Sequence, residues 1–331
     1  MTKIVEQVMD HPSIYRIPVE LPQNPLRTLN SYVIKTPEQS LIIDTGFNRP
    51  ECRASLWTGI QELGLNLKKV SLFLTHLHSD HTGLVYDFVK HGIPVYTGKI
   101  DHDYFASTIL GDTWSILEGL YCREGYPAEE IVLQASGNHA RLYAPKGVYP
   151  ATLLEDGETL QVGAVTVQVI HTPGHTPGHM VLYLPEEQIL FSGDHILFDI
   201  TPNIGIYTGV SDSLSNYLGS LEKIRSLPIR QTFPAHRGQQ GDVYQRIDAL
   251  KEHHRCRLEE IFRAVQSMPG ATAYELAGRI TWSVRGLKWE QFPPNQKWFA
   301  VSETLAHLYY MQHQGRVVRR EVGDRFVYDP A

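Results

Sequence analysis

Runs of apolar residues, bounded by turn residues, divide the first 245 residues into short strands and helices. The run VSLFLT at 70–75 is apolar throughout, which is typical of a strand buried on both faces. Helical spacing of apolar residues occupies 51–64, roughly 81–91 and about 212–226. Ser79 or Asp80 can cap the helix at 81–91. Strand-like runs lie at 13–18, 31–35, 40–44, 94–98, 165–170, 180–184, 188–192 and 229–233. This alternation predicts an α/β fold.

Two regions depart from this alternation. Residues 99–150 carry helical spacing broken by Gly111, Gly125 and Pro127, and we interpret them as a helical insertion. Further along, helical patterns at 246–267, 272–280 and 295–315 precede a hairpin pattern around a Gly-Asp turn. Three helices and a hairpin form the pattern of a winged helix. We therefore expect one domain at 1–245 and a small α+β winged-helix domain at 246–331.

Composition narrows the class of protein. Hydrophobic residues make up 42% of the chain, enough for a sizeable core, and the net charge of −6 argues against a globally basic nucleic-acid binder. Three scattered cysteines indicate a reducing compartment and no disulfide framework. The chain shows neither the apolar run of a signal peptide nor the ~18 apolar residues of a membrane span. We expect a soluble cytoplasmic protein with no membrane partner.

Metal-type side chains follow several of the strand-like runs. THLHSDHTG (75–83) comes directly after VSLFLT, and HTPGHTPGH (171–179), SGDH (192–195) and PAHRG (234–238) follow later runs. Because strand ends can converge on one edge of a sheet, these side chains can share a site. The candidate donors are five histidines and two aspartates, namely His76, His78, Asp80, His81, His175, Asp194 and His236.

This donor set predicts a site for two divalent metal ions. One metal with an open position needs only about three protein ligands, so seven donors fit two metals that share a carboxylate. Neutral imidazole together with carboxylate suits zinc, which we expect, while iron and manganese accept the same ligands.

The motifs carry a resemblance to a known family. THLHSDH resembles the HxHxDH signature of the metallo-β-lactamase superfamily, and GHTPGH, SGD and PAH follow in the order which that superfamily uses. The resemblance covers about residues 13–240 and implies an αββα sandwich of two mixed sheets with helices outside. It implies that His76, His78 and His175 hold one metal, that Asp80, His81 and His236 hold the other, and that Asp194 bridges them. Asp44, in IIDTG, matches the family aspartate that supports a metal ligand.

Departures from the pattern narrow the subfamily. β-Lactamases of this superfamily usually place a cysteine at the position of Asp194, which disfavours antibiotic hydrolysis. Diiron flavoprotein relatives place an acidic residue at the position of His78, which disfavours oxygen reduction. The ligand set is similar to that of glyoxalase-II-like thioesterases and of nucleases of the same fold. A winged helix after the hydrolase domain resembles the β-lactamase-like protein 2 group, whose activity is on RNA.

The expected function is a dinuclear metal-dependent hydrolase of a small-molecule ester or thioester. A metal-activated hydroxide attacks the substrate, with Asp80 and Asp194 as catalytic carboxylates. The alternative is a phosphodiesterase or endoribonuclease whose winged-helix tail holds nucleic acid. A nucleic-acid binder with a vestigial site is a third hypothesis, which the intact ligand set disfavours.

Residues beside the motifs are open to more than one role. His179 is expected to hydrogen-bond a ligand or a turn rather than to bind metal, and His171 and His195 to pack or support ligands. Arg237 is read either as a contact for an anionic substrate or as half of a surface salt bridge. Four side chains of the insertion fit two interpretations equally well, one in which they shape the substrate pocket and one in which they only pack a lid. They are His102, Tyr104, Trp114 and His139.

The C-terminal region is only mildly basic. Residues 246–331 carry 13 Lys and Arg against 10 Asp and Glu, whereas residues 1–245 carry 17 against 26. A helix that reads a nucleic-acid groove would offer more basic and amide side chains than 295–315 does. The arginines of the hairpin are the better nucleic-acid candidates, namely Arg316, Arg319, Arg320 and Arg325. We favour a pocket wall or a homo-oligomer interface for this region.

Overall fold

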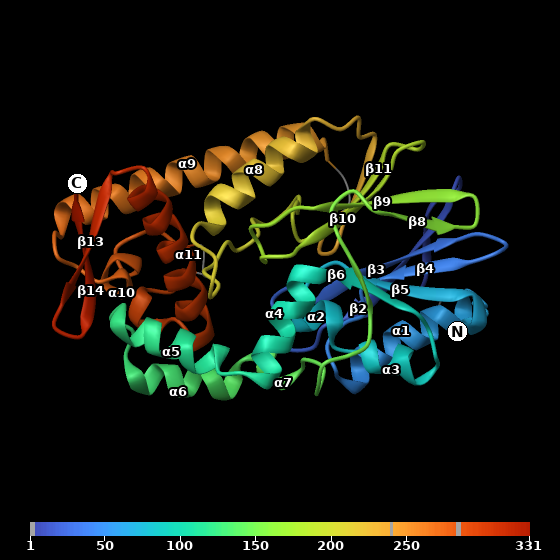
Figure 1. Cartoon of the computed structure of the whole chain (residues 1–331), viewed down its shortest axis with the longest axis horizontal. Coiled ribbons are helices and arrows are strands. Elements are labelled where there is room, and N and C mark those ends of the chain that lie inside the picture. The colour runs from blue at the N-terminus through green and yellow to red at the C-terminus, as the bar shows by residue number, and fades with distance from the viewer. Residues whose placement is uncertain (1–3, 239–240, 283–285) are drawn as a thin grey trace.

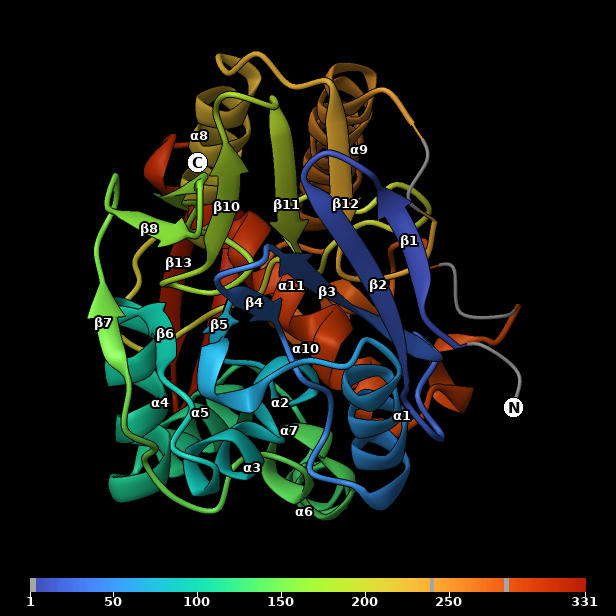
Figure 2. The same ribbon diagram turned by 90° about the vertical axis from the view of Figure 1, so that its right-hand side faces the viewer.

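Two β-sheets pack face to face, and helices cover their outer surfaces (Figure 1). The computed structural model describes residues 4–238, 241–282 and 286–331. The first sheet keeps the strand order β1 to β7, and the second has the order β12-β11-β10-β9-β8. Figure 2 shows the strands of both sheets between the helices α1 to α7 on one side and α8 and α9 on the other. The expected αββα sandwich is confirmed.

The first sheet is antiparallel from β1 to β4 and parallel from β4 to β7. In the second sheet β11 and β12 run parallel, and the other neighbours are antiparallel. The first sheet consists of β1 (Glu6–Met9), β2 (Ser13–Glu20), β3 (Thr28–Lys35), β4 (Ser40–Ile43), β5 (Val70–Leu74), β6 (Val95–Gly98) and β7 (Thr152–Leu154). The second consists of β8 (Thr159–Val162), β9 (Val165–His171), β10 (Met180–Leu184), β11 (Ile189–Gly193) and β12 (Gln231–Pro234).

Buried aromatic rings hold the two sheets together. Tyr32 of β3 contacts Phe191 of β11 and Phe233 of β12, with ring centroids 5.4 and 5.3 Å apart. The Tyr32 hydroxyl also donates to the carbonyl of Pro234 at 2.8 Å. A buried aromatic group with a satisfied hydroxyl stabilises such a contact by its area and its geometry. The ends of β5, β11 and β12 are thereby brought to the same edge of the sandwich.

Helices bury the outer faces of both sheets. Leu56 of α1 and Phe88 of α3 belong to the core on the outer side of the first sheet. Leu214 of α8 and Ile247 of α9 belong to the core that includes Val181 of the second sheet. The helices of these outer layers, with the short ones near the site, are α1 (Pro50–Glu62), η1 (Leu67–Lys69), α2 (Ser79–Thr82), α3 (Val85–Lys90), α8 (Ser213–Arg225) and α9 (Val243–Ser267).

The expected helical insertion lies between β6 and β7. Its helices are α4 (Lys99–Leu110), α5 (Thr113–Arg123), α6 (Ala128–Gly137) and α7 (His139–Leu142). Tyr121 of α5 stacks on Trp298, with ring centroids 3.6 Å apart and planes 2° from parallel. The insertion is therefore packed against the C-terminal region.

The C-terminal region contains the three expected helices and the hairpin. They are α9, α10 (Ala273–Ala277) and α11 (Pro294–His313), with η2 (Trp289–Gln291) between them and the hairpin of β13 (Val317–Val322) and β14 (Arg325–Pro330) at the end. Thr272 caps α10 in a capping box with Glu275. The domain boundary and the winged-helix class remain predictions, and the boundary at residue 246 falls inside the first turn of α9.

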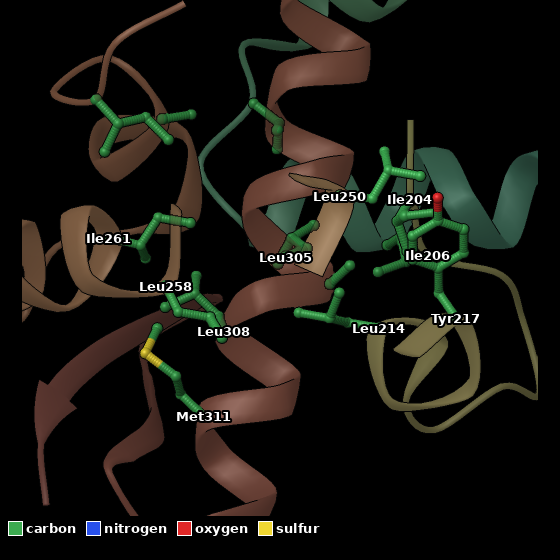
Figure 3. Close-up of a cluster of buried hydrophobic side chains, with 14 of the residues drawn as sticks. Ile204, Ile206, Leu214, Tyr217, Leu250, Leu258, Ile261, Leu305, Leu308 and Met311 are labelled. Carbon is green, nitrogen blue, oxygen red and sulfur yellow. The ribbon is translucent and has the colours of Figure 1, made fainter. Parts of the chain in front are cut away.

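One hydrophobic core joins α8, α9 and α11. Figure 3 shows Leu258 and Ile261 of α9 on one side of α11, Leu214 and Tyr217 of α8 on the other, and Leu305 of α11 between them. Each of these side chains is buried. Burial of a large apolar side chain contributes roughly 1.5–3 kcal/mol, so this shared core ties the C-terminal region to the second sheet.

Three local predictions are wrong. The helix expected at 81–91 is split into α2 and α3, because the amide of Leu84 donates to Thr45 Oγ1 at 3.2 Å instead of continuing the helical ladder. The N-cap of α2 is His78 rather than Ser79 or Asp80. Strands β1 and β8 were not expected, since their partly exposed sequences EQVM and TLQV lack a strong apolar run.

Two further properties follow from the described residues. Cys52, Cys122 and Cys256 are free thiols, in agreement with the expectation from composition. Among residues 4–238, 241–282 and 286–331, every helix is too short or too polar to cross a membrane.

Candidate metal centre

The seven predicted donors meet at one edge of the sandwich. They stand on four loops that follow β5, β9, β11 and β12, which is how side chains far apart in sequence come together. Their donor atoms form three overlapping groups, each with atoms within 4.8 Å of one another. The groups are His76, His78 and His175; His76, His81 and Asp194; and Asp80, His81 and His236.

Three histidines form the first group. Nδ1 of His78 lies 3.1 Å from Nε2 of His76 and 3.0 Å from Nε2 of His175. Three nitrogen atoms facing one another at this spacing suit a single tetrahedral metal with an open position.

The group of Asp80, His81 and His236, called the second group below, combines one carboxylate with two imidazoles. Oδ2 of Asp80 lies 3.5 Å from Nε2 of His236 and 4.0 Å from Nε2 of His81. Both histidine rings are fully buried, and Asp80 is nearly so. Buried charged groups are costly without a partner, so this cluster needs compensating charge.

Asp194 lies between the two groups. Its Oδ2 is 3.6 Å from Nε2 of His175, and its Oδ1 is 3.7 Å from Nε2 of His81 and 3.5 Å from Nε2 of His236. One oxygen therefore faces each group. The turn that presents Asp194 needs glycine at position 193, where φ is +52° and a Cβ would lie 2.6 Å from Nε2 of His179.

The outward nitrogen of each histidine is held by the chain. Nδ1–H of His81 donates to Asp44 at 2.8 Å, that of His175 to the Asn203 carbonyl at 2.9 Å and that of His236 to the Thr28 carbonyl at 2.9 Å. Nδ1 of His76 bonds Thr75 Oγ1 at 3.0 Å, and Nε2 of His78 bonds the Tyr207 hydroxyl at 3.1 Å. These contacts fix each tautomer and direct the lone pair of the other nitrogen into the centre, as in metal-binding histidines.

Inward-facing atoms of the centre are unsatisfied. Nε2 of His81, Nε2 of His236 and Oδ1 of Asp194 are buried and find no hydrogen-bond partner among the described residues. Buried polar atoms almost always have a partner, so three such orphans at one point indicate a missing ligand. The donor set fits divalent metal ions.

The histidine pKa values shift in opposite directions in the two groups. Burial lowers the pKa of His76, His78 and His175, and for His78 it does so to about 3. Burial also acts on His81 and His236, but the neighbouring carboxylates outweigh it and raise both pKa values, that of His81 to about 9. The first group thus presents neutral imidazoles, which are the form that binds metal.

Comparison with known proteins establishes the family. The sequence model described as "Metallo-beta-lactamase superfamily" matches residues 25–236. The chain belongs to the metallo-β-lactamase superfamily. It is therefore a hydrolase of that superfamily, and its His and Asp clusters fit the superfamily's use of divalent metals.

Two curated relatives have informative names. An atrochrysone carboxyl ACP thioesterase from Cryptosporiopsis sp. (strain 8999) is 27% identical over 284 residues, which cover 85% of this chain and 70% of that protein. A β-lactamase-like protein 2 homolog from Caenorhabditis elegans is 26% identical over 270 residues, which cover 78% of this chain and 74% of that protein.

Solved structures extend the likeness to the C-terminal region. A metallo-β-lactamase family protein from Thermus thermophilus is 30% identical with a TM-score of 0.78, covering 96% of this chain and 98% of that chain. A β-lactamase domain protein from Burkholderia ambifaria shares the fold with a TM-score of 0.83 at 23% identity, covering 99% and 94%. Both matches reach well past residue 236, so most of the C-terminal region has a counterpart in them.

Asp44 occupies the supporting position expected from the superfamily resemblance. Besides His81, it accepts hydrogen bonds from the amide and the hydroxyl of Thr75, both at 2.8 Å. The same hydroxyl bonds His76. Asp44 therefore orients one histidine of each group.

His179 supports Asp194 and lies outside the three donor groups. Its Nε2 accepts the amide N–H of Asp194 at 3.1 Å, and its Nδ1 bonds Thr172 Oγ1 at 2.9 Å. His171 bonds the Pro177 carbonyl at 3.0 Å, and the buried His195 ring contacts those of His179 and Tyr217. These contacts agree with the supporting or packing roles expected from sequence.

Asp101 is a supporting residue that the motifs did not reveal. It begins the insertion on α4 and is buried, yet it accepts the amides of Leu77 and Gly178 at 2.9 and 2.5 Å and the hydroxyl of Thr176 at 2.6 Å. Burial raises the pKa of Asp101 to about 6. It joins the loop of His76 and His78 to the loop of His175. An aspartate within the helical pattern, outside the ligand motifs, gives no signal of this role.

The insertion contributes both packing and site contacts. His102 bonds the Tyr149 carbonyl at 2.9 Å, and Arg141 stacks over Trp114, so these two side chains pack the insertion itself. The Tyr104 hydroxyl accepts the amide of Thr208 at 3.2 Å, beside the Tyr207 that contacts His78. The carbonyl of His139 accepts the hydroxyl of Ser79, between two donors of the site.

The Arg237 side chain contacts backbone rather than a carboxylate among the described residues, and its contact with an anionic substrate stays a prediction. Its guanidinium donates to the backbone carbonyl of Pro25, and its own carbonyl accepts from the Asn30 side chain at 3.2 Å. These contacts join the loop of His236 to β3 and to the segment before it.

Proposed function

We propose that this protein is a dinuclear metal-dependent hydrolase of an ester or thioester. The observation that carries the proposal is the position of Asp194, whose two carboxylate oxygens face two different groups of histidines. Such a carboxylate, shared between two ion sites, is the arrangement of two-metal hydrolases. His76, His78 and His175 would hold one ion, and Asp80, His81 and His236 the other.

Two divalent ions at such a centre lower the pKa of bound water toward ~7 and polarise the substrate carbonyl. The chain's own groups position the reactants. Asp80 lies beside His236 in the second group. In the proposal, its carboxylate accepts a hydrogen bond from the attacking water and orients it. His179 and Gly193 fix the backbone of Asp194, so that its two oxygens keep their directions.

Several findings favour a thioester as substrate. The Cryptosporiopsis relative is named as an acyl-carrier-protein thioesterase, as is one from Aspergillus fumigatus, of which this chain spans about half. The hairpin arginines offered as nucleic-acid contacts are largely engaged with carboxylates of the chain. Arg316 pairs with Glu259, Arg319 with Glu124 and Arg320 with Asp329.

The metal is proposed to be zinc. Zinc readily accepts both imidazole nitrogen and carboxylate oxygen, and iron and manganese bind the same set of five imidazoles and two carboxylates. Metal analysis of purified protein tests this proposal, with an expected content of two ions per chain.

The decisive experiment is a side-by-side assay of the metal-loaded protein on acyl thioesters, esters and single-stranded RNA. Asp194→Asn serves as the blank, and a chelator-treated sample as a second one. We expect turnover of a thioester or ester that both blanks lack. Cleavage of RNA alone would replace the proposal with a nuclease, and thioester turnover that survives chelation would remove the metal from the mechanism.

A further inference from the structure

The loop of residues 203–207 holds two histidines of the first group. The carbonyl of Asn203 accepts from Nδ1 of His175 at 2.9 Å. The hydroxyl of Tyr207 accepts from Nε2 of His78 at 3.1 Å and donates to the His175 carbonyl at 2.9 Å. The direction in which both rings face the centre therefore depends on where this loop lies.

Helix α11 of the C-terminal region holds that loop from behind. The side-chain amide of Asn203 donates to Oε2 of Glu303 at 3.2 Å. Ser302 Oγ accepts the amide of Ile206 at 3.1 Å. The loop approaches so closely at Gly205 that a Cβ there would lie 2.5 Å from Ser302 Oγ. Two successive residues of α11 thus hold the loop, Ser302 through the backbone amide of Ile206 and Glu303 through the side chain of Asn203.

Glu303 is an unusual residue for such a place. It is a carboxylate that is only 8% exposed within the helix. The Arg257 guanidinium of α9 lies 3.4 Å away and is itself mostly buried. Burying a carboxylate is costly, and an ion pair at this depth is weak grounds for stability alone. The bond to Asn203 gives the carboxylate a positional role.

We infer that Glu303 is a positioning residue of the metal centre, acting through Asn203 on His175. The inference rests on the proposed function, because it assumes that His76, His78 and His175 hold a metal. It gives the C-terminal region a defined task. The region forms a wall of the site that sets the affinity of one metal position, and it is not a detachable nucleic-acid module.

A purely structural role for Glu303 makes different predictions. If the carboxylate only joins α9 to α11 through Arg257, its loss lowers stability and affects both metal positions alike. If it acts through Asn203, its loss weakens the three-histidine position alone. Removing Asn203 as well should then add nothing, because groups in one chain of contacts are not additive.

The experiment compares the full-length wild type with Glu303→Gln, Glu303→Leu, Asn203→Ala and the Glu303→Leu/Asn203→Ala double variant. Glu124→Gln is the matched control, because Glu124 is a buried carboxylate paired with Arg319 that also ties the C-terminal hairpin to the rest of the chain, away from the loop. Metal affinity is measured by chelator competition with zinc, and each position is followed by the visible spectrum of the cobalt-substituted protein.

We expect Glu303→Leu and Asn203→Ala each to weaken one metal position by about 10-fold, the low end of the range for groups that support a ligating histidine. The Asn203 carbonyl that His175 contacts stays in both variants, but it loses the side-chain bond that fixes its position. The double variant should match Glu303→Leu within about twofold. Glu303→Gln keeps an oxygen for Asn203 and should stay within about threefold of wild type. Glu124→Gln should retain both positions and the wild-type spectrum.

Each contrary outcome has a distinct meaning. A wild type that binds fewer than two ions overturns the proposed function, and with it this inference. Two ions in the wild type with unchanged affinity and spectrum in Asn203→Ala overturn the inference alone. Additive losses in the double variant, or equal losses at both positions, assign Glu303 to stability. Should Glu303→Leu fail to fold, Glu303→Gln and Asn203→Ala still decide the question.

Discussion

The amide N–H of Asp194 donates to Nε2 of His179 across 3.1 Å. Because this nitrogen accepts, the proton of the ring sits on Nδ1, which bonds Thr172 Oγ1 at 2.9 Å. The ring is fully buried and lies against Gly193. His179 therefore supports the proposed bridging carboxylate, as expected from sequence, although GHTPGH places it in the same setting as His175.

Replacing His179 tests that assignment. His179→Ala should retain two metals per chain and lose about 10-fold or more in kcat, because the Asp194 backbone loses its acceptor. His179→Gln, whose amide oxygen can take the place of Nε2, should recover most of the loss. Metal content by emission spectrometry and steady-state kinetics check both variants. One metal per chain in His179→Ala would make the residue a ligand.

Asp194→Asn tests the bridge itself. The amide has one oxygen instead of two, so it can face one group of histidines and not both. We expect a folded protein that keeps the metal of the three-histidine position, loses most of the other and falls by more than about 100-fold in activity. Circular dichroism and metal analysis separate loss of fold from loss of metal. Full activity in this variant would overturn the bridging assignment.

The donor residues could be read from the sequence because each lies directly beyond an apolar strand. His76 and His78 follow β5, and Asp194 follows β11, so the strand pattern alone places them at an edge. The same runs predict an α/β fold, and the αββα sandwich was an implication of the superfamily resemblance. The exact ends of the helices could not be predicted, because they depend on single contacts such as the hydrogen bond from Leu84 to the Thr45 hydroxyl, which splits the helix expected at 81–91.

The supporting residues could not be read in this way. Asp101, Asn203 and Glu303 lie in helical or loop patterns outside the ligand motifs, and each contacts residues that are distant in sequence and close only in the folded chain. Glu303 reaches Asn203 from 100 positions away. Their roles come from tertiary burial of a carboxylate or amide next to a ligand loop, which leaves no periodic trace in the chain.

Asp101 offers a test of how the ligand loops are held. Asp101→Ala leaves the amides of Leu77 and Gly178 and the hydroxyl of Thr176 without their acceptor, which should cost about 3 kcal/mol or more in the free energy of unfolding. Asp103→Asn is the matched control two residues along α4, where an exposed ion pair with Lys99 contributes less than about 1 kcal/mol. Urea unfolding measures both. Equally small losses of unfolding free energy in Asp101→Ala and Asp103→Asn would show that the ligand loops keep their conformation without Asp101.

Glu124 predicts how stability changes with pH. It is fully buried, and burial raises its pKa to about 7 despite its contacts with Arg319 and Tyr328. Between about pH 4.5 and 7 the unfolded chain releases this proton while the folded chain keeps it, so the free energy of unfolding falls as pH rises, by roughly 3 kcal/mol in total. Glu124→Gln cannot titrate. The difference in unfolding free energy between the variant and the wild type should therefore shift in favour of the variant from pH 5 to pH 8. Because both proteins contain the same histidines, the histidine contributions cancel in this difference of unfolding free energies. A difference that stays constant from pH 5 to pH 8 would show that Glu124 ionises normally when folded.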